Sequence, residues 1–119
     1  MTQKERVEAF KAFKEANEDA KEKVWNIVEE ALEIISNLYG KKNKGEVKIN
    51  VVDALNIDFY YERILHAKYS VAKMPLYTVD MEKDGTEEEF GFAFQRLNDL
   101  MEGAKFYFGE VKHIISQYD

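Results

Sequence analysis

Two long stretches of this sequence place apolar residues at alternating spacings of three and four, and the same helix-start signal precedes each. The signal is a threonine followed three residues later by glutamate, at Thr2 and again at Thr86. In this arrangement the threonine hydroxyl accepts a hydrogen bond from the third helical amide, and the glutamate carboxylate accepts one from the threonine amide. The stretches therefore predict long helices over residues 3–39 and 87–118.

The first predicted helix carries a heptad pattern that weakens in its first half. Asn17 occupies a position where the other turns place an apolar residue. Two interpretations stay open: a continuous helix, or a helix that breaks there with Asn17 capping its second part. Gly40 is expected to end the helix in a left-handed conformation. The a positions are Phe10, Asn17, Val24, Ala31 and Leu38, and the d positions are Phe13, Ala20, Ile27 and Ile34.

The second long helix has the cleaner pattern. Gly91, Gly103 and Gly109 lie inside it, and each lowers helix stability by about 1 kcal/mol relative to alanine. None occupies an a or d position, so the glycines flank the apolar seam, where a missing Cβ lets another backbone approach. The a positions are Phe94, Met101, Phe108 and Ile115, and the d positions are Phe90, Leu97, Ala104, Val111 and Tyr118.

The segment between the long helices predicts two short strands. Apolar residues alternate with polar ones over residues 46–52 and again over residues 76–81. Strict alternation is the pattern of a strand with one buried face.

Between these strands, residues 54–73 fit either a helix or a strand by their apolar spacing. A strand of that length without a turn signal is rare, so length favours a helix. Asp53 or Asn56 is positioned to cap this helix. Pro75 is expected to end it, since the residue before a proline avoids the helical conformation.

These elements, in the order α-β-α-β-α, predict a helix-dominated α+β fold in a single domain, residues 1–119. The two long helices would measure about 55 and 48 Å, which exceeds what a compact domain of this size can cover. Three arrangements would resolve this: the helices pair antiparallel with each other, they pair with a second subunit, or the first helix breaks. A two-stranded sheet is also marginal on its own, which favours a homo-oligomer.

The net charge of −6 is carried by the second half of the chain. Residues 1–45 hold nine cationic and nine acidic side chains, whereas residues 86–119 hold three and seven. This distribution argues against direct nucleic-acid binding, which needs a basic stripe, and allows a basic protein partner. The chain has no cysteine. Its polar start and lack of a long apolar run predict a cytoplasmic protein without a membrane segment.

An acidic cluster stands at the start of the second long helix. Its last three members fall in the first helical turn, where the helix dipole favours carboxylates. The functional interpretation is a docking patch for basic residues of a partner protein. The cluster comprises Asp80, Glu82, Asp84, Glu87, Glu88 and Glu89.

Part of this cluster also resembles the first half of a calcium-binding loop, over residues 80–91. Oxygen-bearing side chains alternate from Asp80 and are followed by Gly85. The resemblance ends at position twelve, where Gly91 stands in place of the chelating glutamate. Calcium binding is therefore a minor alternative.

The chain offers little material for catalysis or for a metal centre. Glu110 and His113 have the spacing of a di-iron ligand pair, but a second pair is missing and their heptad positions lie off the seam. The other histidine is His66. Without cysteine or a glycine-rich phosphate loop, we expect neither enzymatic activity nor a cofactor.

The sequence thus predicts a small acidic protein-interaction module that is non-enzymatic and self-associates through its long helices. Val7, Phe10 and Phe13 are the expected apolar contacts, because they begin the first helix among charged neighbours, and Val24 and Ile27 are further candidates for self-association on the same helix. The a-position stripe of the second long helix is the other candidate. The alternative function is an acidic inhibitor that occupies the basic groove of a nucleic-acid-binding protein.

Overall fold

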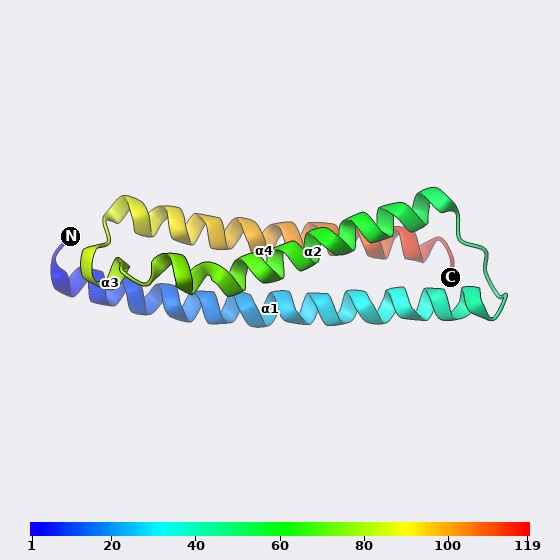
Figure 1. Ribbon diagram of the computed structural model, residues 1–119, viewed down its shortest axis with the longest axis horizontal. Helices are drawn as coiled ribbons and strands as arrows, with labels where there is room; N and C mark the ends of the chain where they lie inside the picture. Colours follow the sequence, from blue (N-terminus) through cyan, green and yellow to red (C-terminus); the bar gives the residue numbers. More distant parts are fainter.

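The computed structural model describes residues 1–119 and is built from helices alone (Figure 1). α1 runs along the whole molecule, α2 returns antiparallel to it, and α4 runs parallel to α1, so the three long helices form a bundle. α3 is a single turn between α2 and α4. The rod measures 63 × 19 × 19 Å. The bounds are α1 Gln3–Asn43, α2 Val51–Thr78, α3 Met81–Asp84 and α4 Glu87–Ser116.

The predicted α+β fold is wrong, because neither expected strand forms. In place of the strand over residues 46–52, the chain crosses the end of the bundle in an irregular conformation and enters α2. Val47 and Ile49 pack there with Leu38 and Ile57. The alternation arises because every second side chain of this crossing meets the core, but no second strand supplies hydrogen bonds.

The second predicted strand, residues 76–81, is divided between the last turn of α2 and the start of α3. Of its alternating apolar residues only Met81 is buried, whereas Tyr77 and Val79 are exposed. The helix predicted over residues 54–73 is confirmed, and α2 extends beyond it at both ends.

Pro75 does not end α2, although a proline removes one helical hydrogen bond. Proline has no N–H, so the carbonyl of Val71, four residues earlier, loses its helical donor. The Asn17 side chain of α1 supplies a replacement, since its Nδ2 donates to the Val71 oxygen over 3.2 Å. Asn17 is buried, and α1 is continuous through it. Asn17, which suggested a break in the first predicted helix, instead supplies the hydrogen bond that is missing in α2.

Both threonine signals form complete capping boxes, as the sequence predicts. Thr2 and Thr86 each accept a hydrogen bond from the amide three residues later, over 3.1 Å. The amides of the two threonines donate in turn to the carboxylates of Glu5 and Glu89. The starts of α1 and α4 are therefore fixed by local sequence.

The other helix ends differ from expectation. Gly40 lies inside α1, which continues to Asn43, and the glycine with positive φ is Gly45, at 75°. α2 is capped by Asn50, whose Oδ1 accepts from the Val52 amide over 2.7 Å. This cap lies earlier than the expected Asp53 or Asn56, so the helix gains its first turn from residues assigned to a strand.

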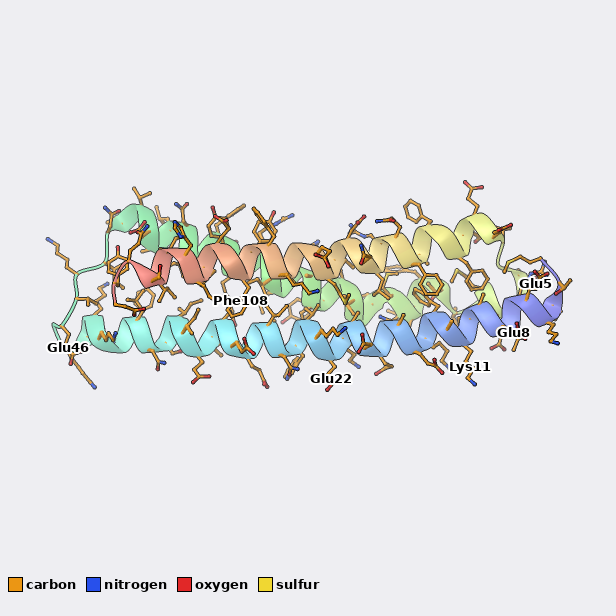
Figure 2. All side chains as sticks on the ribbon, turned by 180° about the vertical axis from the view of Figure 1, so that it is seen from behind. Glu5, Glu8, Lys11, Glu22, Glu46 and Phe108 are labelled. Carbon is orange, nitrogen blue, oxygen red and sulfur yellow. The ribbon has the colours of Figure 1, made fainter.

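The core consists of three apolar clusters in a row along the rod, to which all three long helices contribute. In the largest cluster, Phe13 packs edge-on against Phe94 of α4, with ring centroids 5.3 Å apart. The outward side of α1 is charged, and Figure 2 shows Lys11 and Glu22 pointing away from the other helices. α1 therefore covers one side of the α2–α4 pair and leaves the opposite side open.

Candidate protein-binding surface

The six residues of the acidic cluster lie together at one end of the rod, and all six are exposed. None of them takes part in an ion pair. Their segment is fastened to α1, because Arg6 Nε donates to the Gly85 carbonyl over 2.9 Å and Gln3 Nε2 donates to the Glu82 carbonyl over 3.1 Å. Gly85 is required in this turn, since a Cβ there would stand 2.5 Å from the Met81 carbonyl oxygen.

The calcium-loop resemblance is not accompanied by a cation site. Residues 81–84 form the helical turn α3. Nowhere does a group of three His, Asp or Glu side chains converge as metal ligands would. The geometry therefore gives the calcium alternative no support.

The fold divides the apolar contacts that were expected on the first helix. Phe13 is fully buried in the chain's own core, and Phe10 is half-buried beside it. Val7 remains 44% exposed. Since α4 supplies the partner for Phe13 within the chain, Val7 alone is too small a patch for a docking surface.

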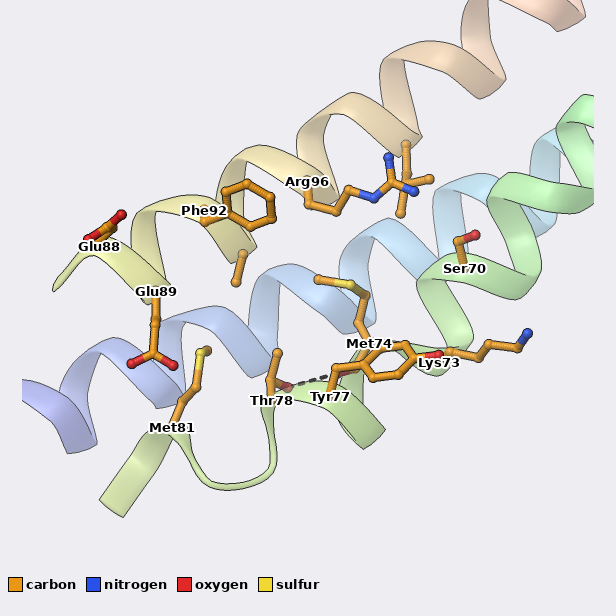
Figure 3. Close-up of a pocket in the computed structure, with 12 residues that line it drawn as sticks. Ser70, Lys73, Met74, Tyr77, Thr78, Met81, Glu88, Glu89, Phe92 and Arg96 are labelled. Carbon is orange, nitrogen blue, oxygen red and sulfur yellow. Dashed lines mark hydrogen bonds between the residues drawn. The ribbon is translucent and has the colours of Figure 1, made fainter. Parts of the chain in front are cut away.

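A different surface, the groove between α2 and α4 on the side that α1 leaves open, contains a hollow of about 580 Å³. The floor of the hollow includes the buried side chains of Met74, Met81 and Leu100. Tyr77 from α2 and Phe92 from α4 stand on either side of it, and each is 75% exposed (Figure 3). This end of the groove therefore offers an apolar floor between two exposed rings.

Charged side chains of both signs surround the hollow. Glu88 and Glu89 belong to the acidic cluster, while Lys73 and Arg96 lie farther along the two helices toward the middle of the rod. None of these four side chains takes part in an ion pair. Their charges remain available to a molecule that enters the groove.

The groove continues along the helix pair toward the other end of the rod. A smaller hollow of about 200 Å³ shares Arg96 and Leu100 with the first and is also lined by Ala67 and Gly103. A Cβ on Gly103 would meet nothing within 4 Å. Packing inside the chain therefore does not account for a glycine that costs the helix about 1 kcal/mol.

Beyond Gly103 four aromatic rings form a ridge on the helix pair. Phe59 and Tyr60 of α2 meet edge to face with centroids 5.6 Å apart, and Tyr60 stacks on Tyr107 of α4 at 5.8 Å. Phe106 meets Tyr107 at 5.3 Å. Phe59 is 51% and Phe106 is 61% exposed. These four residues are named the aromatic ridge.

The two ends of the rod differ in charge. Residues 80–89 hold six carboxylates against one lysine. Residues 41–48, named the lysine loop, comprise the last residues of α1 and most of the connection to α2 at the opposite end, and they hold four lysines against one glutamate. The groove therefore runs from an acidic end to a basic loop.

Hydrogen bonds fix the chain at both ends and shift two pKa values. Donation to Asp53 raises the pKa of the Tyr118 hydroxyl above its usual 10.0, because proton loss would place two anions side by side, while the hydroxyl also accepts from the Asn50 amide. At the other end, hydrogen bonds from Thr2, foremost from its amide, lower the pKa of Glu5. Both groups lie outside the groove.

No helix combines the length and the apolar character needed to span a membrane. Comparison with protein-family models, with curated proteins and with solved structures finds no match. Inference about function therefore rests on the surfaces of the molecule itself.

Sequence reasoning missed the groove because its residues fall outside the heptad seam. Tyr77 was assigned to a strand, and Phe92 and Phe106 lie at neither a nor d positions. The signal that could have found them is the presence of large aromatic residues on the polar side of amphipathic helices.

Proposed function

We propose that this protein is a non-enzymatic interaction module that self-associates through the groove between α2 and α4. The observation that carries the proposal is the set of large rings that the fold leaves exposed along this groove. Tyr77 and Phe92 lie at one end, and Phe59 and Phe106 lie at the other. Groups of exposed apolar residues on a small protein commonly mark an interaction site.

The one exposed tryptophan lies outside the groove and has polar contacts within the chain. Trp25 on α1 lies under the ammonium group of Lys68, with Nζ 3.8 Å from the ring centroid, and its indole N–H donates to Glu29 over 2.7 Å. These contacts engage both the face and the N–H of the ring within the chain, although Trp25 remains 46% exposed. Phe92 makes no stacking contact with another ring or with a cation.

Sedimentation velocity over a range of concentrations tests the proposal. We expect a reversible association that Phe92→Ser and Phe106→Ser each weaken at least tenfold, because each removes an exposed ring from the interface. Leu32→Ser is the control, since Leu32 is also an exposed apolar residue, at 50%, but lies on α1. A wild-type protein that stays monomeric to several hundred micromolar, or a control that weakens association equally, would contradict the proposal.

A second candidate function is that of an acidic inhibitor of a basic protein. It is supported by the acidic cluster, whose six exposed carboxylates have no ion-pair partner and stand on a segment fastened to α1. A rigid group of uncompensated carboxylates suits a surface that otherwise holds phosphates.

Binding of a lysine homopolymer at several salt concentrations tests the second candidate. Replacing Glu87, Glu88 and Glu89 together by lysine should abolish binding, and added salt should weaken the wild type steeply. The matched control replaces Glu8, Glu15 and Glu22, which are exposed on α1, by lysine and changes the net charge equally. Equal losses in both variants would mean that only net charge matters, and the candidate would be discarded.

A further inference from the structure

The groove between α2 and α4 has a projecting end and a recessed end. The aromatic ridge projects Phe59 and Phe106, whereas the hollow beside Tyr77 and Phe92 has room for additional side chains. Along α4, the ridge and the centre of the hollow are about 18 Å apart at 1.5 Å per residue. A surface with a projection and a matching recess at different heights can pair with a copy of itself in the opposite direction.

We propose that a second copy of this chain covers the groove in antiparallel orientation, so that the ridge of each copy enters the hollow of the other. This inference rests on the proposed function and specifies its geometry. The two copies are related by a two-fold axis that crosses the groove at right angles to the rod. α2 then lies on α2 of the second copy, and α4 lies on α4.

The positions of ridge and hollow on α4 and on α2 each give the same location for this axis along the rod. On α4, Phe106 and the hollow between Phe92 and Arg96 are symmetric about Leu100. On α2, Phe59 and the hollow between residues 73 and 77 are symmetric about Ala67. Ala67 and Leu100 line the same small hollow and are thus at one level of the rod.

Gly103 acquires a role in this arrangement. It lies within one helical turn of the axis, so α4 of the second copy passes close to it. In the antiparallel register, position 96 of one copy faces position 104 of the other, so Arg96 lies beside Gly103, where no side chain obstructs it. The open space around the missing Cβ is thus filled by the second copy, although nothing inside the chain fills it.

The charges favour the antiparallel orientation over the parallel one. It sets the six carboxylates of the acidic cluster beside the end that carries the lysine loop of the second copy. Near the axis, Arg63 and Arg96 of each copy surround the two Asp99 carboxylates, with His66 beside them. A parallel pair would instead place acidic cluster on acidic cluster and ridge on ridge, leaving both hollows empty.

Distances between spin labels in the full chain test this geometry. Because the chain has no cysteine, Glu87→Cys, Asp99→Cys and His113→Cys each introduce a single labelling site. Labels at residue 99 should be within about 25 Å, the spacing of packed helices plus two label arms. Labels at residue 87, or at residue 113, should be about 39 Å apart lengthwise, because each lies thirteen residues from the axis.

A mixture of the Glu87→Cys and His113→Cys proteins supplies the decisive control. These two positions face each other across the antiparallel pair, so a short distance should occur in the mixture and in neither protein alone. Short distances at all three single sites would show a parallel pair and overturn the inference, while leaving self-association intact. Absence of any dipolar coupling, with a monomer in sedimentation, would overturn both the inference and the proposed function.

Discussion

The two sides of the α2–α4 pair differ in how completely they are covered. On the side that meets α1, Phe13 and its neighbours are enclosed, and no buried side-chain polar atom lacks a hydrogen-bond partner. On the opposite side, Phe92 and Phe106 stand exposed beside a hollow. The outward side of α1 carries charged residues, so a solvent-facing helix surface in this chain can be polar. The difference teaches that the chain encloses the apolar residues of this helix pair on one side and leaves large rings in water on the other.

The largest expected effect is a difference in the free energy of unfolding between two phenylalanine substitutions, one on each side of the α2–α4 pair. Phe13→Ala should lower the free energy of unfolding by about 3–5 kcal/mol, because it leaves a cavity in the covered core. Phe92→Ala should change it by less than about 0.5 kcal/mol in the monomer, because the ring is already in water. Urea denaturation at low micromolar concentration measures both values. A loss above about 2 kcal/mol for Phe92→Ala would remove the contrast between the two sides.

The next effect concerns the polar contact on the covered side. Asn17→Ala should cost about 1–3 kcal/mol, because it leaves the Val71 carbonyl without a donor. In a Pro75→Ala background the cost should be smaller, since the restored amide of residue 75 can donate to that carbonyl. Thermal unfolding of the four proteins in a double-mutant cycle measures the coupling, with the exposed Asn37→Ala as control. Equal costs in both backgrounds would show that Pro75 and Asn17 are independent.

The capping box at Thr2 lies at the end of the rod, and removing it tests whether this end of α1 contributes to the stability of the bundle. Thr2→Ala should lower the free energy of unfolding by about 1 kcal/mol.

Since hydrogen bonds from Thr2 lower the folded-state pKa of Glu5, the stabilisation by Glu5 is complete above its ordinary pKa of 4.5. It is lost as the pH falls through the folded-state value.

Thermal unfolding of Glu5→Gln and the wild type between pH 7 and pH 3 measures this dependence. The difference between the two proteins should shrink on acidification. Glu22→Gln serves as the control, because Glu22 is exposed and makes no hydrogen bond or ion pair. A difference that persists unchanged at pH 3 would contradict the assignment.

The smallest effect separates two glycines of α4. Gly103→Ala and Gly109→Ala should each raise monomer stability by about 0.5–1 kcal/mol, because a Cβ at either position meets open space and alanine favours a helix. Only Gly103→Ala should weaken self-association, since Gly103 alone of the two lines the groove. Chemical denaturation and sedimentation together measure both properties. Weaker association in Gly109→Ala would place the contact on another side of α4.

Local signals made the helix starts predictable, whereas the middle of the chain depended on tertiary contacts. The capping boxes at Thr2 and Thr86 follow from side chains three residues apart, so sequence suffices to find them. The helix through Pro75 does not follow from local sequence, because Asn17, 58 residues earlier, replaces the missing donor. The alternation of apolar and polar residues near Ile49 likewise depends on tertiary contacts, because this segment crosses the end of the bundle.

The candidate surface was the least predictable part of the molecule. The acidic cluster is contiguous in sequence, and it stays together in the fold. The groove instead combines residues of α2 and α4, such as Tyr77 and Phe92, and exists only after the two helices pack. The heptad pattern separates the seam residues from all others but does not distinguish among the others. It therefore does not separate Phe106 from its charged neighbours.

The contact between Asn17 and Val71 also determines which alignment of α1 the bundle can accept. Helices with a seven-residue repeat can slide past each other by one repeat and still bury apolar residues. A shift of α1 by seven residues would set Phe10 or Val24 opposite the Val71 carbonyl, and neither side chain can donate a hydrogen bond. The buried carbonyl would then be left unsatisfied. A single amide thus protects a long, repetitive interface against slippage.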